Sequence, residues 1–259
     1  MNFKRYYYLI SLQYLGFRFH GWQIQPNVPT VELMIKKTLR FILPDAKTKI
    51  MACGRTDAMV SAEQTYVELF SDQKLPNLDV FLGTFNYNLP ADIKALNIKE
   101  VDNTFNIIQD SKVKEYHYYF AFGGKFHPFS ATLMCHVKAN LDIEIMTKAT
   151  KAFKGKKDFY SYTFRPKTQT QTTAEILSCQ LRLNNELTAS FFPKQSYVLK
   201  VKGTGFKRNQ IRLMMGMLFD LGQHKVNYDF FLKTLDGYNK IKLEHIAPAS
   251  GLILHKVEF

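Results

Sequence analysis

The 259-residue sequence is poor in the residues that build covalent or metal cross-links. It has three cysteines, Cys53, Cys135 and Cys179, and no two of them form a CxxC pair. A zinc ribbon or a disulfide framework is therefore not indicated, and a reducing compartment fits this composition. The seven histidines are scattered without HExxH or a similar ligand spacing, so metal catalysis has little support.

Long apolar runs are also missing. No apolar stretch reaches the roughly 20 residues that a membrane-spanning helix needs. The first residues, MNFKRYYYLI, lack a long apolar core followed by a small-residue cleavage site. We therefore expect a cytoplasmic protein with no membrane partner.

Several loops that bind cofactors or carry nucleophiles do not occur either. GTGF at 203–206 begins like a dinucleotide-binding loop, but Arg208 stands where GxGxxG requires a glycine. Neither the phosphate loop GxxxxGK[ST] nor the nucleophile elbow GxSxG is found. We expect the glycines near 203 to turn a strand into a helix.

Positive charge is in excess, and it is unevenly placed. The chain has 35 Lys and Arg against 22 Asp and Glu, a formal net charge of +13. Residues 1–105 carry 12 basic and 10 acidic residues (+2), whereas residues 106–259 carry 23 and 12 (+11). This surplus indicates a polyanionic partner, nucleic acid before membrane, about as strongly as it indicates a basic protein without such a partner.

The hydrophobic pattern predicts the order β-α-β-β-α-β twice. In the first half we expect strands at 4–14, 47–53, 64–70 and 93–101, and helices at 30–42, with Thr30 as N-cap, and 78–87. In the second half we expect strands at 114–122, 174–183, 196–203 and 251–259, and helices at 141–155, ended by Gly155, at 206–222 and at 227–238. The repeat predicts an α+β fold of two ferredoxin-like units, 1–105 and 106–259, joined into one mixed/antiparallel sheet with helices on one face and a central cleft.

The stretch GRTDA, residues 54–58, is the main candidate for chemistry. An isolated Arg-Thr-Asp favours a turn in which Asp57 caps the next segment and Arg55 is solvated. This one lies at the end of the second strand, where a cleft to the second unit could open. Arg208 and Arg212 are expected at i, i+4 on one helical face, and an arginine there would keep Asp57 ionised. An oriented carboxylate can act as a nucleophile or an electrostatic stabiliser at a sugar carbon.

The strand KEYHYYF is expected to alternate its side chains between two faces. Tyr116 and Tyr118 would face one way, and His117 and Tyr119 the other. The pattern is compatible with an ordinary packed aromatic strand, and also with a tyrosine that stacks on an extruded base.

Six ordered motifs resemble the TruA family of tRNA pseudouridine synthases over nearly the whole chain. They are HGWQIQPNVPTVE (20–32), GRTDAMVSA (54–62), NYNLPADI (86–93), KEYHY (114–118), GTGFKRNQIRLMMG (203–216) and APASGL (247–252). The resemblance implies isomerisation of uridine to pseudouridine at positions 38–40 of tRNA, a homodimer, and no cofactor or metal. The catalytic residues that it implies are Asp57, Tyr116 and Arg212, and the RNA-binding residues are Arg55, Lys207, Arg208 and Gln23.

By the same resemblance, Asp57 attacks the ribose C1′ or, in a competing scheme, abstracts a 2′ proton. The uracil then detaches at N1, turns, and reattaches through C5. The loop departs from the family pattern at Met59, which replaces a glycine, and at Ser61, which replaces a histidine. Because glycine permits a positive φ at no steric cost and methionine does not, we expect a different path for the loop after Asp57.

Two other functions are compatible with the sequence. One is a tRNA-binding or RNA-folding protein that has lost catalysis, in keeping with the basic second half and the altered loop. The other is a glycosidase-type enzyme with Asp57 and Glu63 as paired carboxylates. Tritium release from uracil C5 would distinguish an isomerase from a binder, and free base as product would identify a glycosidase.

Overall fold

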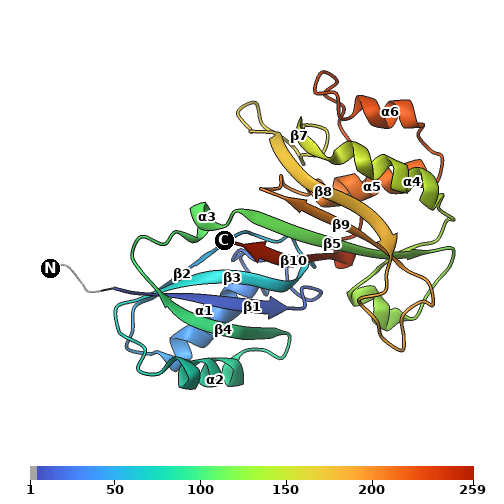
Figure 1. Ribbon diagram of the computed structural model, residues 1–259. Coiled ribbons are helices and arrows are strands. Elements are labelled where there is room, and N and C mark those ends of the chain that lie inside the picture. Colours follow the sequence, from blue (N-terminus) through green and yellow to red (C-terminus); the bar gives the residue numbers. More distant parts are fainter. Residues whose placement is uncertain (1–4) are drawn as a thin grey trace. The chain divides into compact units, whose positions relative to one another are not determined.

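The computed structural model describes residues 5–259, which form two compact units. The first unit contains the described residues up to Lys112 together with Leu254–Phe259, and the second contains Val113–Ile253. Helices and strands occur in both units (Figure 1). Most strand pairs are antiparallel, but β5 (Val113–Phe122) and β6 (Cys135–Val137) are parallel. The prediction of an α+β fold with a mixed sheet is therefore confirmed.

The first unit has the predicted order of elements. They are β1 (Tyr6–Tyr14), α1 (Val31–Ile42), β2 (Thr48–Ala52), β3 (Ser61–Ser71), α2 (Leu78–Asn88), β4 (Ile93–Val101) and a short α3 (Ile107–Asp110) that was not predicted. β1 pairs antiparallel with β3 and β4, and β2 pairs antiparallel with β3. The helices α1 and α2 contact each other on one face of this sheet (Figure 1). Of the strand predicted at 4–14, Lys4 lies outside the described residues.

Local sequence explains where α1 begins and which side it buries. The Thr30 side chain accepts a hydrogen bond from the Leu33 N–H at 3.4 Å, so the predicted N-cap is confirmed. Val31, Ile35 and Leu39 recur at i, i+4 and are buried. Burial of each such side chain contributes about 1.5–3 kcal/mol, which holds the helix on the sheet.

The second unit repeats the order with additions. Its main elements are β5, α4 (Ile143–Thr150), β7 (Gly155–Asp158), β8 (Thr173–Leu183), β9 (Tyr197–Gly203), α5 (Gln210–Gly222), α6 (Tyr228–Lys233) and β10 (Leu252–Glu258), the last of which ends in the first unit. β9 pairs antiparallel with β5 and β8, and β8 pairs with β7. β6 and β7 were not predicted, since each has only three or four residues.

All three predicted helices of the second unit are shorter than predicted, and α6 spans only Tyr228–Lys233 instead of 227–238. α4 ends at Thr150 and passes into a 3₁₀ turn, Lys151–Phe153, so Gly155 does not end a helix but begins β7 with φ of 103°. α5 begins at Gln210 rather than 206, because Asn209 has a left-handed backbone with φ of 57°. Arg208 therefore precedes the helix, and the prediction that Arg208 and Arg212 share one helical face is wrong.

α5 is buried along almost its entire length. Only Arg212 and Asp220 among its 13 residues are not buried, which is typical of a core helix rather than an amphipathic one. Arg212, Gly216 and Asp220 follow one another at i, i+4, and the extended segment His245–Ala247 lies along this stripe. The Ala247 N–H donates to the Arg212 carbonyl at 3.1 Å, and His245 Nδ1 lies 2.9 Å from Asp220 Oδ1.

Gly216 makes the close approach of this segment possible. A Cβ atom built at Gly216 would overlap the carbonyl group of His245. The backbone of the segment thus occupies the space that any other side chain at 216 would need. Such a requirement explains a glycine in a buried helix interior, where it otherwise costs roughly 0.5–1 kcal/mol relative to alanine.

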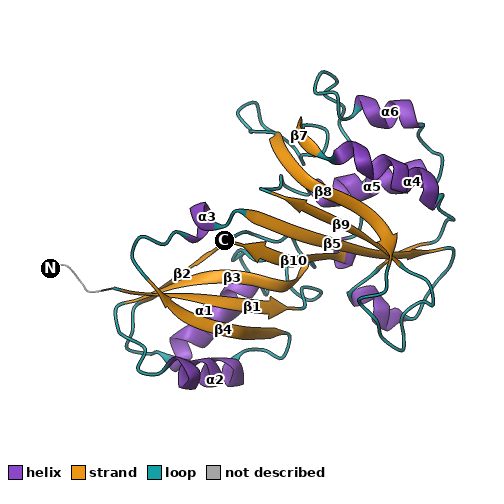
Figure 2. Cartoon of the chain, viewed as in Figure 1, coloured by secondary structure: helices purple, strands orange, loops and turns teal. Residues whose placement is uncertain are grey.

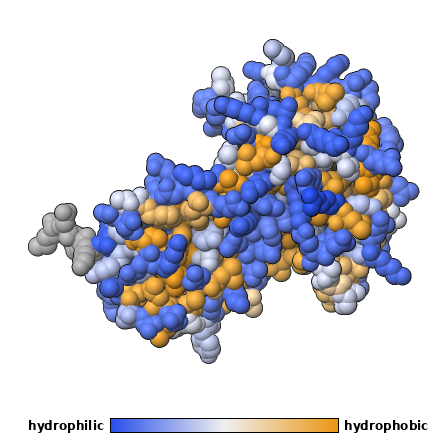
Figure 3. All heavy atoms as spheres, viewed as in Figure 1, coloured by the Kyte–Doolittle hydropathy of each residue, from blue (hydrophilic) through white to orange (hydrophobic). Residues whose placement is uncertain are grey.

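Hydrophobic side chains also reach the surface. Figure 3 shows orange areas between hydrophilic side chains on the face drawn there. Scattered exposure of this kind is ordinary for a folded protein. Over residues 5–259, we find no helix with the length and apolar character that crossing a membrane requires.

The packing at Gly216 predicts opposite effects for two Gly→Ala substitutions. Gly216→Ala should lower the free energy of unfolding by about 1–3 kcal/mol, because the methyl group displaces His245. Gly83→Ala is the control: Gly83 lies in α2, and nothing lies within 4 Å of a Cβ placed there, so stability should rise by about 0.5–1 kcal/mol. Urea unfolding followed by circular dichroism measures both. A neutral Gly216→Ala would contradict the close approach.

Candidate functional site

Asp57 follows a residue that is held firmly in the core of the first unit. The Thr56 hydroxyl lies 2.8 Å from the Tyr14 hydroxyl, and the Thr56 carbonyl accepts a hydrogen bond from the Trp22 N–H at 3.1 Å. Thr56, Tyr14 and Trp22 are all buried, whereas Asp57 itself is half-buried. The Val60 N–H donates to the Asp57 carbonyl at 3.2 Å and closes the turn that the sequence predicted as one alternative. The backbone of Asp57 is thereby fixed on both sides.

The turn at Asp57 packs against the loop that contains Gly21. Gly21 has φ of 90°, and a Cβ there would lie 2.8 Å from the Thr56 carbonyl oxygen and 3.1 Å from the Asp57 carbonyl carbon. The Met59 N–H donates to the Phe19 carbonyl at 3.0 Å. Two loops that are distant in sequence therefore share backbone contacts, and a larger residue at position 21 would separate them.

Met59 has the backbone conformation that usually belongs to glycine. Its φ is 65°, in the left-handed region, and its side chain is 37% exposed. Methionine thus adopts the positive φ that glycine would permit without cost, and the different loop path that we expected relative to the family stays a prediction. The Phe19 carbonyl and the turn at Asp57 hold Met59 in place, at a strain of roughly 1–2 kcal/mol.

The predicted RNA-binding residues of the first unit lie at its surface. Gln23 follows buried Trp22, and Arg55 precedes buried Thr56, and both side chains are exposed. Each is thus attached to a rigid backbone while its polar end reaches solvent. This arrangement suits contact with a polar ligand, although nothing in the first unit alone identifies that ligand.

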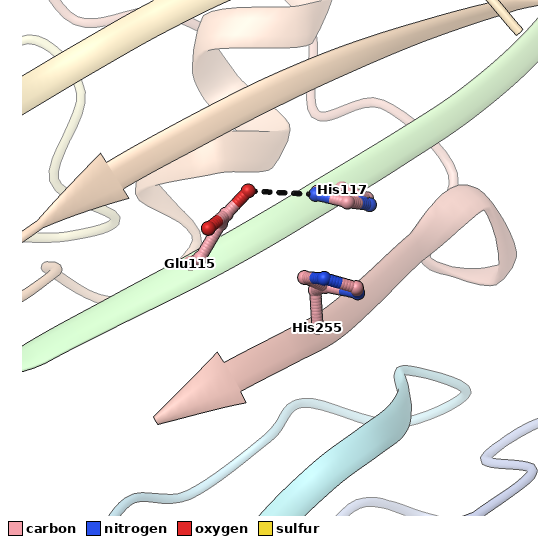
Figure 4. Close-up of side chains that lie close together, drawn as sticks. All are labelled: Glu115, His117 and His255. Carbon is pink, nitrogen blue, oxygen red and sulfur yellow. Dashed lines mark hydrogen bonds and ion pairs between the residues drawn. The ribbon is translucent and has the colours of Figure 1, made fainter. Parts of the chain in front are cut away.

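Strand β5 alternates as the sequence predicted. Tyr116 forms an edge contact with Phe206, and Tyr118 forms one with Phe219 of α5, with ring centroids 5.2 and 6.2 Å apart. On the opposite face, His117 Nε2 lies 2.9 Å from Glu115 Oε1 (Figure 4). The predicted catalytic Tyr116 is therefore on the α5 side of β5, where it is half-buried.

Arg212 is positioned by the segment that crosses Gly216. Its Nε donates to the Ala247 carbonyl at 2.8 Å, and the Tyr118 hydroxyl donates to the next carbonyl, that of Pro248, also at 2.8 Å. Burial raises the pKa of Tyr118 well above its ordinary value, and the Arg212 charge opposes this rise. The guanidinium group therefore lies on the same side of β5 as Tyr116, and this brings two of the three predicted catalytic residues together in one unit.

Lys207 and Arg208 lie in the turn before α5. Lys207 is half-buried, and burial lowers the pKa of its ammonium group, an effect that the Asp158 carboxylate partly offsets. Arg208 is exposed, and its guanidinium carbon lies 5.1 Å from the ring centroid of Phe164. Both predicted RNA-binding residues thus adjoin the helix that carries Arg212.

Sequence reasoning missed the residues that hold these side chains in place. Tyr14 fixes Thr56, and the Ala247 carbonyl fixes Arg212. Trp22 and Ala247 do lie in two of the matched motifs, GWQ and APASGL. A motif, however, does not reveal which backbone group it contacts, so the structure was needed to show these roles.

The chain is similar in sequence to known proteins over nearly its whole length. A family model described as tRNA pseudouridine synthase matches residues 149–259. The tRNA pseudouridine synthase A 2 of Bacillus thuringiensis subsp. konkukian is 30% identical over 253 residues, 97% of this chain and 99% of that protein. The tRNA pseudouridine synthase A of Pelobacter propionicus is 30% identical over 96% of this chain and 98% of its own. That of Ruminiclostridium cellulolyticum is 29% identical over the same shares of the two chains.

The strain at Met59 predicts that glycine there stabilises the first unit. Met59→Gly should raise the free energy of unfolding by up to about 1 kcal/mol, because relief of strain exceeds the added chain entropy. The neighbouring Ala58 does not have a positive φ, so Ala58→Gly should lower it by about 0.5–1 kcal/mol. Urea unfolding followed by the fluorescence of Trp22, the single tryptophan, reports on this unit. Equal losses in both variants would contradict the strain.

Proposed function

The chain belongs to the tRNA pseudouridine synthase A family, and from this membership we infer that it isomerises uridine to pseudouridine in tRNA. Relatives with that name match it over 96–97% of its length, and they cover the motifs on which the resemblance rests. The observation that best supports the proposal is the placement of Asp57. Its loop is fixed by buried Thr56, while its side chain remains half-buried rather than enclosed.

We assign the chemistry to Asp57. In the reaction, the bond between uracil N1 and ribose C1′ breaks, a bond between C5 and C1′ forms, and C5 loses a proton while N1 gains one. No atom is lost from the nucleotide. The aspartate must be ionised, either to attack C1′ or to take a 2′ proton, and it must be held in place while the base turns. The hydrogen bonds around Thr56 support the second requirement.

Arg212 and Tyr116 have supporting roles in this proposal. A guanidinium group favours the ionised form of a carboxylate, and Arg212 is the arginine that the resemblance assigns to Asp57. Arg212 Nε donates a hydrogen bond to the Ala247 carbonyl, and this bond orients the whole guanidinium group. Tyr116 presents a phenol ring edge-on to Phe206 and would pack against the target base.

The RNA-binding residues in the proposal are Arg55, Gln23, Lys207 and Arg208. Arg55, Gln23 and Arg208 are exposed, and Lys207 is half-buried. The excess positive charge of residues 106–259 would attract the phosphate backbone. A homodimer and a location in the cytoplasm are also part of the proposal, and both rest on the resemblance and on the substrate.

Asp57→Asn should abolish isomerisation and leave RNA binding intact. We expect the rate to fall by at least about 1,000-fold, since an amide is neither a nucleophile nor a base here, while tRNA affinity changes less than about threefold. Tritium release from tRNA labelled at uracil C5 measures the rate, and filter binding measures the affinity. Release at the normal rate would show that Asp57 is not catalytic, and an inactive wild-type protein that binds tRNA would favour the RNA-binding alternative.

Glu63→Gln is the matched control for Asp57→Asn. Glu63 is a nearby carboxylate in the same unit, and its Oε2 lies 2.6 Å from His255 Nδ1, so its charge already has a structural partner. We expect its rate of tritium release to stay within about threefold of the wild type. A loss as large as that of Asp57→Asn would instead support paired carboxylates.

The proposal also specifies which uridines of the tRNA are modified. The resemblance leads us to expect pseudouridine at positions 38–40 of tRNA. Sequencing of tRNA after carbodiimide treatment, from cells with and without the gene, should show these pseudouridines only when the gene is present. If pseudouridines at other positions disappear instead, the chain is a synthase with a different target.

A further inference from the structure

A pocket of about 400 Å³ lies in the second unit, and none of the residues that line it is among the catalytic or RNA-binding residues proposed above. One loop follows β7 and supplies residues from 160 to 166 except Tyr162, and the other follows α6 and supplies residues from 241 to 246 except His245 (teal in Figure 2). The lining is mixed: Phe164, Leu243 and Ile246 are apolar, and the exposed residues Arg165, Lys242 and Glu244 provide charged groups. We call this the Phe164 pocket.

Cations lie against two of the aromatic rings that line the Phe164 pocket. The guanidinium carbons of Arg165 and Arg208 lie 5.0 and 5.1 Å from the ring centroid of Phe164. The Lys240 ammonium nitrogen lies 5.5 Å from the ring centroid of Tyr160. The Phe164 N–H donates to the Arg208 carbonyl at 3.0 Å and ties this loop to the turn before α5. Planar groups that can stack on a ligand are therefore held next to positive charge.

These cations have no carboxylate partner. Counting only residues 5–259, no carboxylate oxygen lies within 4.0 Å of a side-chain nitrogen of Arg165, Arg208, Lys240 or Lys242. Arg165 is also held with φ of 48°, a left-handed conformation that a non-glycine residue adopts at a cost. Exposed cations without a partner beside aromatic rings are suited to an anionic, planar ligand.

The combination favours a nucleotide over other ligands. A purely anionic molecule would not use the apolar walls, and an apolar molecule would leave the cations unpaired. A nucleotide uses both, because its base stacks on aromatic rings or guanidinium planes and its phosphate pairs with Arg or Lys. A volume of about 400 Å³ falls within the range of small-ligand pockets. The Glu244 carboxylate can accept from a ribose hydroxyl or a base amino group.

We propose that the Phe164 pocket binds one unpaired nucleotide of the RNA substrate, distinct from the uridine that is isomerised. The base lies against the rings and guanidinium groups at Phe164 and Tyr160, and the phosphate lies beside Arg165 and Lys242. The inference rests on the proposed function for the identity of the RNA. Since none of the pocket residues is a proposed catalytic residue, loss of the pocket should raise KM and leave kcat nearly unchanged.

The first test compares two variants of the pocket with one control. Phe164→Leu keeps an apolar side chain but removes the ring, and it should raise the Kd for an anticodon stem–loop hairpin about fivefold or more. The double variant Arg165→Gln with Lys242→Gln changes only exposed side chains and should raise it about tenfold. Lys154→Gln removes an exposed lysine from another pocket of the same unit, whose lining has no aromatic residue, and should change Kd less than twofold.

The second test asks whether a base enters the pocket. A series of hairpins is made, each with an abasic site at a different loop position. The Kd of each hairpin is measured with the wild type and with Phe164→Leu. One position, other than the target uridine, should weaken binding to the wild type about fivefold and have little effect on the variant, because the two changes remove the same contact. Uridine monophosphate is the competing probe, and it should not displace the hairpin at concentrations near the hairpin Kd.

Each result has a defined meaning. If the double variant and Lys154→Gln raise Kd equally, the pocket contributes only general electrostatic attraction, and the proposal is overturned. Absence of coupling at every loop position would also overturn it, as would displacement by uridine monophosphate, which would make the ligand a free nucleotide. A wild-type protein that shows the coupling but releases no tritium from tRNA would refute the proposed function and leave the pocket as an RNA-binding site.

Discussion

The segment His245–Ala247 can lie directly on helix α5 only because Gly216 has no side chain. Where this segment passes over Gly216, main-chain groups of Ala247 reach Arg212, one turn before, and the imidazole of His245 reaches Asp220, one turn after. Arg212 is held at one end through Ala247, and Asp220 is held at the other through His245. The two residues of this helix that are not buried are thus both held by the same short segment. The orientation of Arg212 thus depends on the absence of a side chain at Gly216.

The first unit uses a comparable arrangement around Thr56. There, too, a backbone carbonyl and a hydroxyl are fixed by buried partners, Trp22 and Tyr14, and the polar residue next in sequence keeps partial access to solvent. In the first unit these hydrogen bonds fix the backbone at Asp57, and in the second a main-chain carbonyl accepts a hydrogen bond from the Arg212 side chain itself. The cost of left-handed backbone at Met59 shows that the fold tolerates strain to keep this loop in place.

Sequence reasoning found the long, periodic elements and the main motifs, because hydrophobic spacing and N-caps such as Thr30 act locally. It failed where a conformation depends on distant contacts. The start of α5 depends on Asn209 in a left-handed conformation, and the short strand β7 depends on pairing with β8. The conformation of Met59 could not be foreseen from a residue that rarely adopts it. The Phe164 pocket went unnoticed because its two loops are about 80 residues apart and neither has a motif of its own.

During translation, the first unit lacks its last strand, β10, until the end of the chain has been made. Residues Leu254–Phe259 belong to that unit and lie beside β3, yet they follow the whole second unit, about 140 residues, along the chain. At 5–20 residues per second, the ribosome needs roughly 7–28 s to make the intervening part. During this interval β2 pairs with residues 67–71 of β3, but the rest of that edge lacks the β10 neighbour and can pair with another nascent chain. We therefore expect chaperone binding to matter more while this protein is translated than after its release.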